Sequence, residues 1–308
     1  MTASDTANIF LSTIILASVV LNTTACYIIL FKVKKRKLTH LFIISISVAN
    51  LIESIIGLTP QLVISNEFVL VKTPLCVINS FVIMGLAITS ITHISVLSLV
   101  RIVVIKYPIF YYKTCKKMWC KVFLISICYI YGFGWATIPL IGWSKYVLDL
   151  DKMRCSLDWK LTQADSLSFI LTLLVFCNIL PGIVISLTTY IGTKTISKKK
   201  SNEVCSTEKE KPVDILEKYY LRVFTLSAVM FFVIWTPYAV VGILTLSKFV
   251  IPTHFVTVAA LFAKLSTISN VLINCFINKS FRNQLFSLGI IQAFKNKSKR
   301  VSPVFPEK

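Results

Sequence analysis

The chain has 308 residues, of which 56% are hydrophobic and 15% are charged, and its mean hydropathy is +0.77. This is too little charge to cover the surface of a water-soluble globular protein. The composition therefore favours a bundle of membrane helices. The net charge of +20 raises the question of a nucleic-acid partner, and the placement of the charges along the chain decides against one.

Seven apolar runs are each long enough to cross a bilayer as a helix. They cover residues 9–31, 41–64, 74–105, 120–142, 165–193, 218–246 and 255–277. These runs predict an all-α membrane protein, a seven-transmembrane-helix bundle that forms one domain over residues 1–288. We expect residues 289–308 to be a disordered cytoplasmic tail.

Lysine and arginine gather on one side of the predicted membrane. If successive loops alternate sides, the side with the carboxyl terminus holds 26 of the 33 Lys and Arg residues. Five lie in 32–37, six in 101–121, eight in 194–222 and seven from 279 onward. Cytoplasmic loops carry such an excess, so we expect the amino terminus outside and the carboxyl terminus in the cytoplasm. The basic loops would then face anionic lipid and a cytoplasmic partner, and no nucleic acid.

The nine cysteines do not form a disulfide scaffold. The predicted topology leaves only Cys76 and Cys155 at the outer face, which gives one disulfide in an oxidising compartment. We expect the other cysteines to be reduced.

Two charged residues stand out within the predicted spans. The second span carries Glu53, the only carboxylate deep in the membrane, one turn from Asn50 and therefore on the same helix face. The seventh span carries Lys264, the only lysine or arginine deep within an apolar run. A bare ammonium at that depth is costly, so Lys264 should be paired, neutral or covalently modified.

The motifs around these charges resemble the opsins among the rhodopsin-like receptors, over nearly the whole chain. In opsins a seventh-helix lysine forms the retinal Schiff base six residues before an Asn, as Lys264 does before Asn270. A short amphipathic surface helix opening Asn-Lys-x-Phe-Arg follows, and Asn278-Lys279-Ser280-Phe281-Arg282 matches it. The Pro and Tyr of the family's Asn-Pro-x-x-Tyr motif are replaced by Val271 and Asn274.

The outer loop and the sixth span carry two further matches. The run from Gly142 to Tyr146, Gly-Trp-Ser-Lys-Tyr, and the later Cys155-Ser156-Leu157-Asp158-Trp159 resemble the second outer loop of opsins. Trp235-Thr236-Pro237-Tyr238 is close to the family's Trp-x-Pro-Tyr. The resemblance implies a chromophore pocket around Lys264. The apolar and aromatic side chains of this pocket would suit a long polyene. The pocket residues we expect are Ile83, Met84, Trp159, Phe231, Trp235 and Tyr238.

A protonated Schiff base needs a counterion, and the sequence leaves two candidates. Asn79 occupies the helix-three position at which some opsins carry the acid, and it cannot supply the charge. Other opsins use an acid six residues before the outer-loop cysteine, which here is Asp149. Glu53 is the second candidate because it lies on a neighbouring helix at a similar depth. If neither acid pairs with the base, the pigment would absorb in the ultraviolet.

The resemblance also implies a signalling route. Arg101 keeps its place 25 residues after Cys76, although Val100 and Ile102 replace the other residues of the family's Asp/Glu-Arg-Tyr triplet. It would latch to Glu217 in the resting state, and the opened face would bind a heterotrimeric G protein. Asn278 and Lys279 occupy positions that contact the G protein in opsins. Arrestin and a receptor kinase are further partners that the family implies, and the plasma membrane is the expected location.

We therefore predict a light-sensing receptor, not an enzyme, with retinal as its covalent cofactor. Two alternatives stay open. One is a rhodopsin-like receptor for a diffusible small molecule without a covalent chromophore, in which Lys264 pairs with Glu53 or with a ligand acid. The other is a transporter or channel whose proton path uses the same two residues, although no internal repeat supports it.

Overall fold

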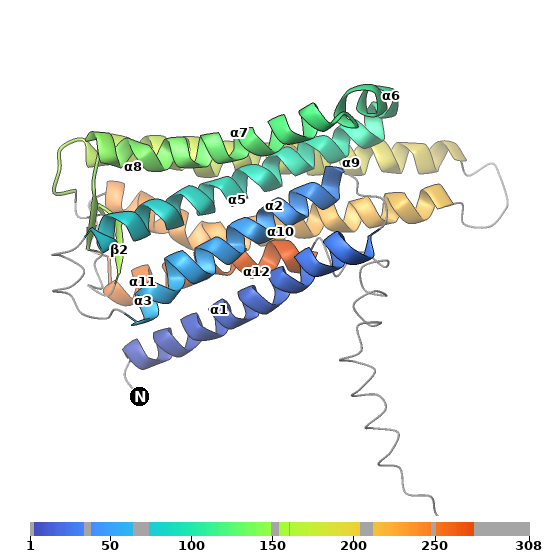
Figure 1. The fold of residues 1–308 in the computed structure, drawn as a ribbon. Helices are drawn as coiled ribbons and strands as arrows, with labels where there is room; N and C mark the ends of the chain where they lie inside the picture. The colour runs from blue at the N-terminus through green and yellow to red at the C-terminus, as the bar shows by residue number, and fades with distance from the viewer. Residues whose placement is uncertain are drawn as a thin grey trace, which may run out of the picture.

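The computed structural model describes residues 3–33, 38–63, 74–148, 154–159, 161–203, 212–247 and 251–273. Within these ranges, seven helical segments are long and apolar enough to cross a membrane. They run alongside one another in a single elongated bundle (Figure 1). The expected all-α, seven-helix architecture is confirmed. The surface helix expected after the seventh span and the tail at 289–308 lie outside the described residues.

The elements follow one another in a simple up-and-down order. The first three spans are α1 (Ala3–Tyr27) with the π-helical turn η1 (Ile28–Lys32), α2 (Leu38–Ile52) with η2 (Glu53–Leu58) and α3 (Thr59–Val63), and α5 (Leu75–Lys106). The fourth span and the connection before it are α6 (Pro108–Phe110), η3 (Tyr111–Cys115), α7 (Met118–Thr137) and η4 (Ile138–Ile141). The last three spans are α8 (Ser166–Leu174) with η5 (Val175–Ile179) and α9 (Leu180–Glu203), α10 (Pro212–Leu246), and α11 (Thr253–Lys264) with α12 (Ser266–Val271).

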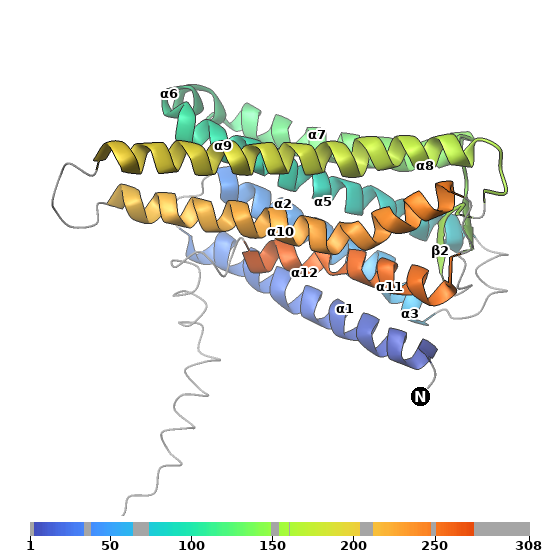
Figure 2. The ribbon, with the colours of Figure 1, turned by 180° about the vertical axis from the view of Figure 1, so that it is seen from behind.

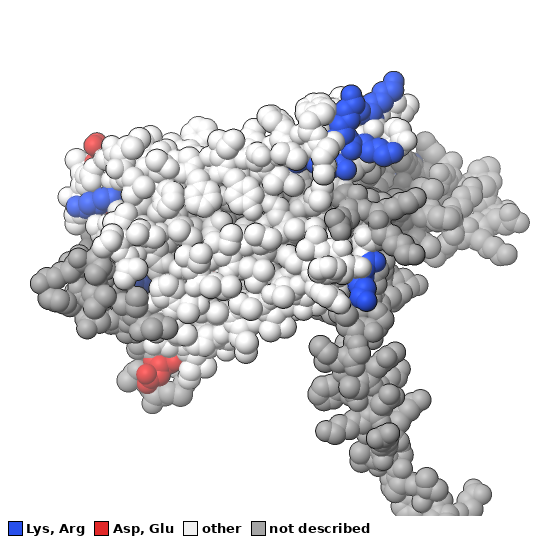
Figure 3. Space-filling model, in the orientation of Figure 1, with Lys and Arg blue, Asp and Glu red and all other residues white. Residues whose placement is uncertain are grey.

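The surface of the bundle fits a hydrocarbon surrounding. Large apolar side chains such as Leu16, Ile130 and Ile183 are exposed on its flanks. The face in Figure 3 shows a broad band without charged side chains, with lysine and arginine gathered mainly at one end. In lipid, backbone groups find no water to bond with, so helices that satisfy their own N–H and C=O groups are the stable solution for such sequences.

Helix α5 is the central element, because it packs against α2, α7 and α9. Its contact with α7 is close at Gly132. A Cβ atom added there would lie 2.6 Å from the Gly85 carbonyl oxygen and 2.7 Å from the Thr89 nitrogen, and it would overlap Thr89 Oγ1. Only a residue without a side chain permits this approach of the two backbones.

A two-stranded hairpin covers one end of the bundle, which we call the hairpin end; the opposite end, which carries α6, is the α6 end (Figure 1). Strand β1 (Tyr146–Leu148) pairs antiparallel with β2 (Cys155–Leu157). The predicted disulfide between Cys76 and Cys155 is present, with a Cα–Cα distance of 5.3 Å. It fastens β2 to the first turn of α5.

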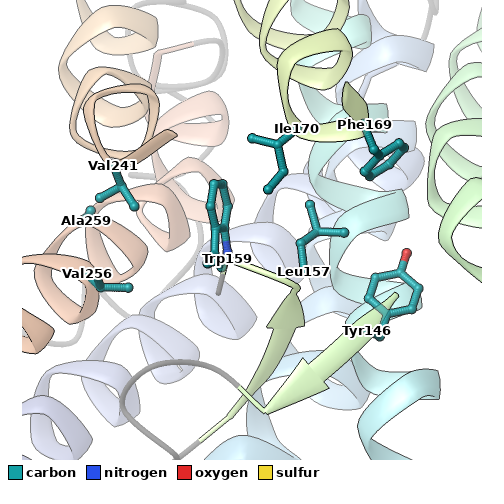
Figure 4. Packing of buried hydrophobic residues seen from close by; sticks show 8 residues of the cluster. All are labelled: Tyr146, Leu157, Trp159, Phe169, Ile170, Val241, Val256 and Ala259. Carbon is teal, nitrogen blue, oxygen red and sulfur yellow. The ribbon is translucent and has the colours of Figure 1, made fainter. Parts of the chain in front are cut away.

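Beneath the strands, side chains of the hairpin segment and of α8, α10 and α11 form one apolar cluster (Figure 4). Trp159 lies between Val241 and Ala259 on one side and Leu157 and Ile170 on the other. The hairpin is therefore part of the core of this end of the bundle.

Seen from behind, α10 lies between α9 and the α11–α12 pair (Figure 2), and it packs against all three. Pro237 lies inside α10, where it removes one helical hydrogen bond. Such a break is tolerated inside a bundle in which neighbouring groups satisfy the freed carbonyl.

We expect Gly132→Ala to destabilise the protein by about 1–3 kcal/mol, because the added methyl group overpacks the α5–α7 contact. The temperature of half-unfolding in detergent micelles, followed by circular dichroism, measures this. Gly134→Ala is the matched control, since a Cβ at Gly134 meets nothing within 4 Å. Equal stability of the two variants would contradict the close contact.

Candidate functional site

A cavity of about 170 Å³ lies under the hairpin, between η2–α3, α5, α8–η5, α10 and α11. One water needs roughly a tenth of that space, so the cavity has room for a small molecule. Its walls are mostly apolar. Six of the seven residues expected to form the chromophore pocket line it, namely Ile83, Met84, Trp159, Trp235, Tyr238 and Lys264.

Lys264 lies at an interruption of the seventh span. It is the last residue of α11, and α12 begins at Ser266. At the interruption the Leu265 N–H donates to the Phe262 carbonyl at 3.0 Å, three residues back instead of four. The Thr267 hydroxyl donates to the Lys264 carbonyl at 2.9 Å. The lysine side chain is 7% exposed and lines the cavity.

Two asparagines hold the helix beyond this interruption. Asn22 Nδ2 donates to the Thr267 carbonyl at 3.0 Å, and Asn50 Nδ2 donates to the same oxygen at 2.9 Å. Asn50 Nδ2 also donates to Asn22 Oδ1 at 3.1 Å. These buried bonds join the first, second and seventh spans. They fix the seventh helix within one turn of Lys264, because buried polar groups that are fully bonded rigidify their surroundings.

Glu53 is the carboxylate that shares the cavity with Lys264. It begins the π-helical turn η2, it is 2% exposed, and it lines the cavity. The ammonium of Lys264 attracts it electrostatically. Glu53 Oε2 accepts no hydrogen bond from any described residue. A π-turn adds a residue to the helical repeat and re-aims the side chains at its start, as is common at functional sites.

The hairpin contributes a second cation that the sequence pattern did not indicate. Arg154 precedes Cys155, is 8% exposed, and lines the cavity, as does the buried Gln61 of α3. Its position follows from the disulfide, which holds the residue before Cys155 beside the cavity. In the sequence, only its position next to Cys155 could have indicated that Arg154 lies at the cavity.

The aromatic side chains divide between the cavity wall and the layer behind it. The Trp159 and Tyr238 rings meet edge to face with centroids 5.2 Å apart, and both line the cavity. Phe231 does not line it. This side chain is buried in a cluster with Ile91 and Trp235, so it supports the wall instead of contacting the cavity.

Asp158 positions Trp159 through its own hydrogen bonds. Its Oδ2 accepts from the Thr162 hydroxyl at 2.9 Å, the Gln163 N–H at 3.0 Å and the Ser166 hydroxyl at 2.9 Å. Burial alone would raise the pKa of Asp158, but these bonds outweigh it and lower the pKa below its usual 3.8. The carboxylate thus ties the segment after β2 to the start of α8.

The remaining predicted residues lie away from the cavity. Arg101 is buried near the α6 end of α5, and Asn270 is buried in α12. Glu217 belongs to α10, and its side chain is not among those that the structure describes. Asp149, Asn278 and Lys279 lie outside the described residues, so their roles stay predictions.

We expect Asp158→Asn to lower the free energy of unfolding by about 1–3 kcal/mol at neutral pH, because three hydrogen bonds lose a charged acceptor. The lowered pKa gives the pH dependence: the stabilisation is present above the unfolded pKa of 3.8 and is lost as the pH falls through the folded value. Thermal unfolding of both proteins between neutral and acidic pH measures this. The difference between them should shrink in acid.

Asp165→Asn is the control, because Asp165 is exposed and makes no side-chain cap hydrogen bond at α8. A loss of stability in this variant as large as in Asp158→Asn would contradict the assigned role of Asp158.

The comparisons with known proteins point to one receptor family. The family model "7 transmembrane receptor (rhodopsin family)" matches residues 21–278. Mouse (Mus musculus) Opsin-3 is 29% identical over 81% of this chain and 62% of its own length. The "Rhodopsin, G0-coupled" of Mizuhopecten yessoensis is 26% identical over 82% of this chain and 64% of its own length. The chain thus spans under two thirds of the length of these two relatives.

A solved structure shows the same fold. The crystal structure of squid rhodopsin superposes with a TM-score of 0.75 at 19% sequence identity, covering 92% of this chain and 84% of that one.

A third relative by sequence, chicken (Gallus gallus) Pinopsin, is 23% identical over 91% of this chain and 79% of its own length. The protein therefore belongs to the rhodopsin family of seven-transmembrane receptors, and its sequence is similar to opsins of that family.

Proposed function

We propose that this protein is a light-sensing receptor that binds retinal through a Schiff base at Lys264 and activates a heterotrimeric G protein. The observation that carries the proposal is the buried Lys264 side chain in the wall of a mostly apolar cavity of about 170 Å³. The relatives named above are opsins and rhodopsins, which supports the same reading.

The residues around the cavity fit a long apolar aldehyde. Condensation of an amine with an aldehyde forms the linkage and releases one water, and it requires an unprotonated amine. The cavity supplies an amine shielded from bulk water, and burial favours the neutral form of a lysine. Trp159, Tyr238 and Trp235 line part of the remaining wall and offer large apolar surfaces. When bound, retinal would supply the photochemistry, while the protein supplies binding and charge.

Glu53 is the counterion that the described residues support. It shares the cavity with Lys264, interacts with it electrostatically, and has a carboxylate oxygen without a hydrogen bond among the described groups. A cation in a low-dielectric surrounding is stabilised by a nearby carboxylate far more than it would be in water. Asp149 stays the alternative predicted from the sequence.

The proposed signal runs along α10 to the α6 end of the bundle. Trp235 lines the cavity, and Pro237 lies two residues further along the same helix. A change of ligand shape against Trp235 would bias α10 between two positions, with the proline as the pivot. Arg101 lies near the far end of α5, where a rearranged α10 would open a surface for the G protein. In this proposal the α6 end is cytoplasmic and the membrane is the plasma membrane, with arrestin and a receptor kinase as further partners.

One observation favours the alternative, a receptor for a diffusible small molecule. Lys264 already has Glu53 as an electrostatic partner, and such a pair can exist without any chromophore.

Addition of 11-cis retinal to the purified protein in the dark should produce a new absorption band. Lys264→Ala should lose that band completely, because the amine is removed. Difference spectra before and after illumination make the measurement. Lys145→Ala, a lysine beside β1 that is not part of the cavity wall, is the control and should keep the band. A folded parent protein that forms no band would favour the diffusible-ligand receptor.

If Glu53 is the counterion, Glu53→Gln should move the absorption of the retinal-bound protein from the visible to the near-ultraviolet at neutral pH. The protonated form of the base loses its partner charge, so its pKa falls. Spectra recorded over a pH series measure the change. Asp149→Asn is the parallel variant; a shift there together with an unchanged Glu53→Gln spectrum would assign the counterion to Asp149.

A further inference from the structure

Two cysteines meet at the α6 end, away from the disulfide of the hairpin end. Cys115 ends η3, and Cys120 lies in the first turn of α7. Lys116 and Lys117 form the turn between these elements. Both cysteines are buried, at 8% and 7% exposure, whereas Lys116 and Lys117 are exposed.

The two thiols lie in the same apolar surroundings. Cys115 and Cys120 belong to one buried cluster with Leu97 and Val100 of α5, and Cys120 acts on Cys115 electrostatically across the two-residue turn. Cys128 belongs to the same cluster, but its thiol donates to the Leu124 carbonyl at 3.1 Å, one turn back in its own helix. Cys128 is therefore a natural internal control for a buried thiol in the same surroundings.

Neighbouring thiols can be joined by a mild oxidant. Two thiols and one molecule of hydrogen peroxide give one disulfide and two molecules of water, so the sulfurs are oxidised and the peroxide is reduced. An S–S bond is about 2.05 Å long, so the two side chains must turn toward each other within their shared cluster for the bond to form. Burial raises the pKa of Cys115, and the adjacent Cys120 raises it further. Because the thiolate is the reactive form, the reaction should be slow at neutral pH and faster at alkaline pH.

We propose that Cys115 and Cys120 form a reversible disulfide on exposure to a peroxide, and that this bond fixes the turn between η3 and α7. Through the shared cluster, the bond also anchors this turn to α5 beside Val100, the residue before Arg101. The α6 end of the receptor thus carries a redox-sensitive modification site. This inference is independent of the retinal proposal.

Peptide mapping tests the bond directly on the full-length protein in detergent micelles. The protein is treated with hydrogen peroxide, free thiols are alkylated, and the protein is denatured and digested with trypsin. Trypsin cuts after Lys113, Lys116, Lys117 and Lys121, so the bond would join the peptides 114–116 and 118–121. The expected product has the summed mass of the two peptides less two hydrogens, and it disappears on reduction with dithiothreitol.

The controls use single serine substitutions. Cys120→Ser and Cys115→Ser should each abolish the linked product, and Cys128→Ser should leave its yield unchanged. In the folded oxidised protein, trypsin should also cut more slowly after Lys116 and Lys117, which tests whether the turn is fixed. The proposal is overturned if both cysteines remain fully alkylated after peroxide, if either is linked to a different cysteine, or if the product joins two separate chains.

Discussion

An amine buried within a membrane bundle is the constraint around which this structure is arranged. A charged ammonium at that depth costs a few kcal/mol, and a lysine in the middle of a span does not easily reach the headgroups. Two features around Lys264 offset the free-energy cost of burying its ammonium. Glu53 provides an opposite charge, and the cavity provides space for a partner. Few other residues within the described spans are charged, so this pair sets the chemistry of the core.

The backbone around the pair is irregular on both helices. The seventh span is interrupted between Lys264 and Ser266, and the second span widens into a π-turn that starts at Glu53. The Asn22 and Asn50 amides bond to the Thr267 carbonyl and hold the interrupted helix in place. Regular helices would satisfy their own hydrogen bonds better. At this position the two departures place the Lys264 and Glu53 side chains in the wall of one cavity.

Much of the fold followed from the sequence, because a membrane span is encoded by a continuous apolar run. The seven helices, the Cys76–Cys155 disulfide and the presence of Lys264 in the cavity wall were all predicted from local patterns. The details that depend on tertiary contacts were not. No proline or glycine marks the interruption after Lys264, and Arg154 reaches the cavity only because the disulfide places its strand there. Phe231 was expected to line the cavity, but its side chain packs in the layer behind the cavity wall. The sequence alone does not distinguish these two layers, because the difference depends on tertiary contacts.

The proposed light-sensing function depends on the covalent attachment of retinal at Lys264. Borohydride reduces an imine to a stable secondary amine, so treating the retinal-bound protein with it should fix the chromophore on its lysine. Because trypsin does not cut after a modified lysine, we expect one peptide, 249–279, that carries the retinyl mass. Recovery of the two unmodified peptides 249–264 and 265–279, or the retinyl mass on a different lysine, would contradict it.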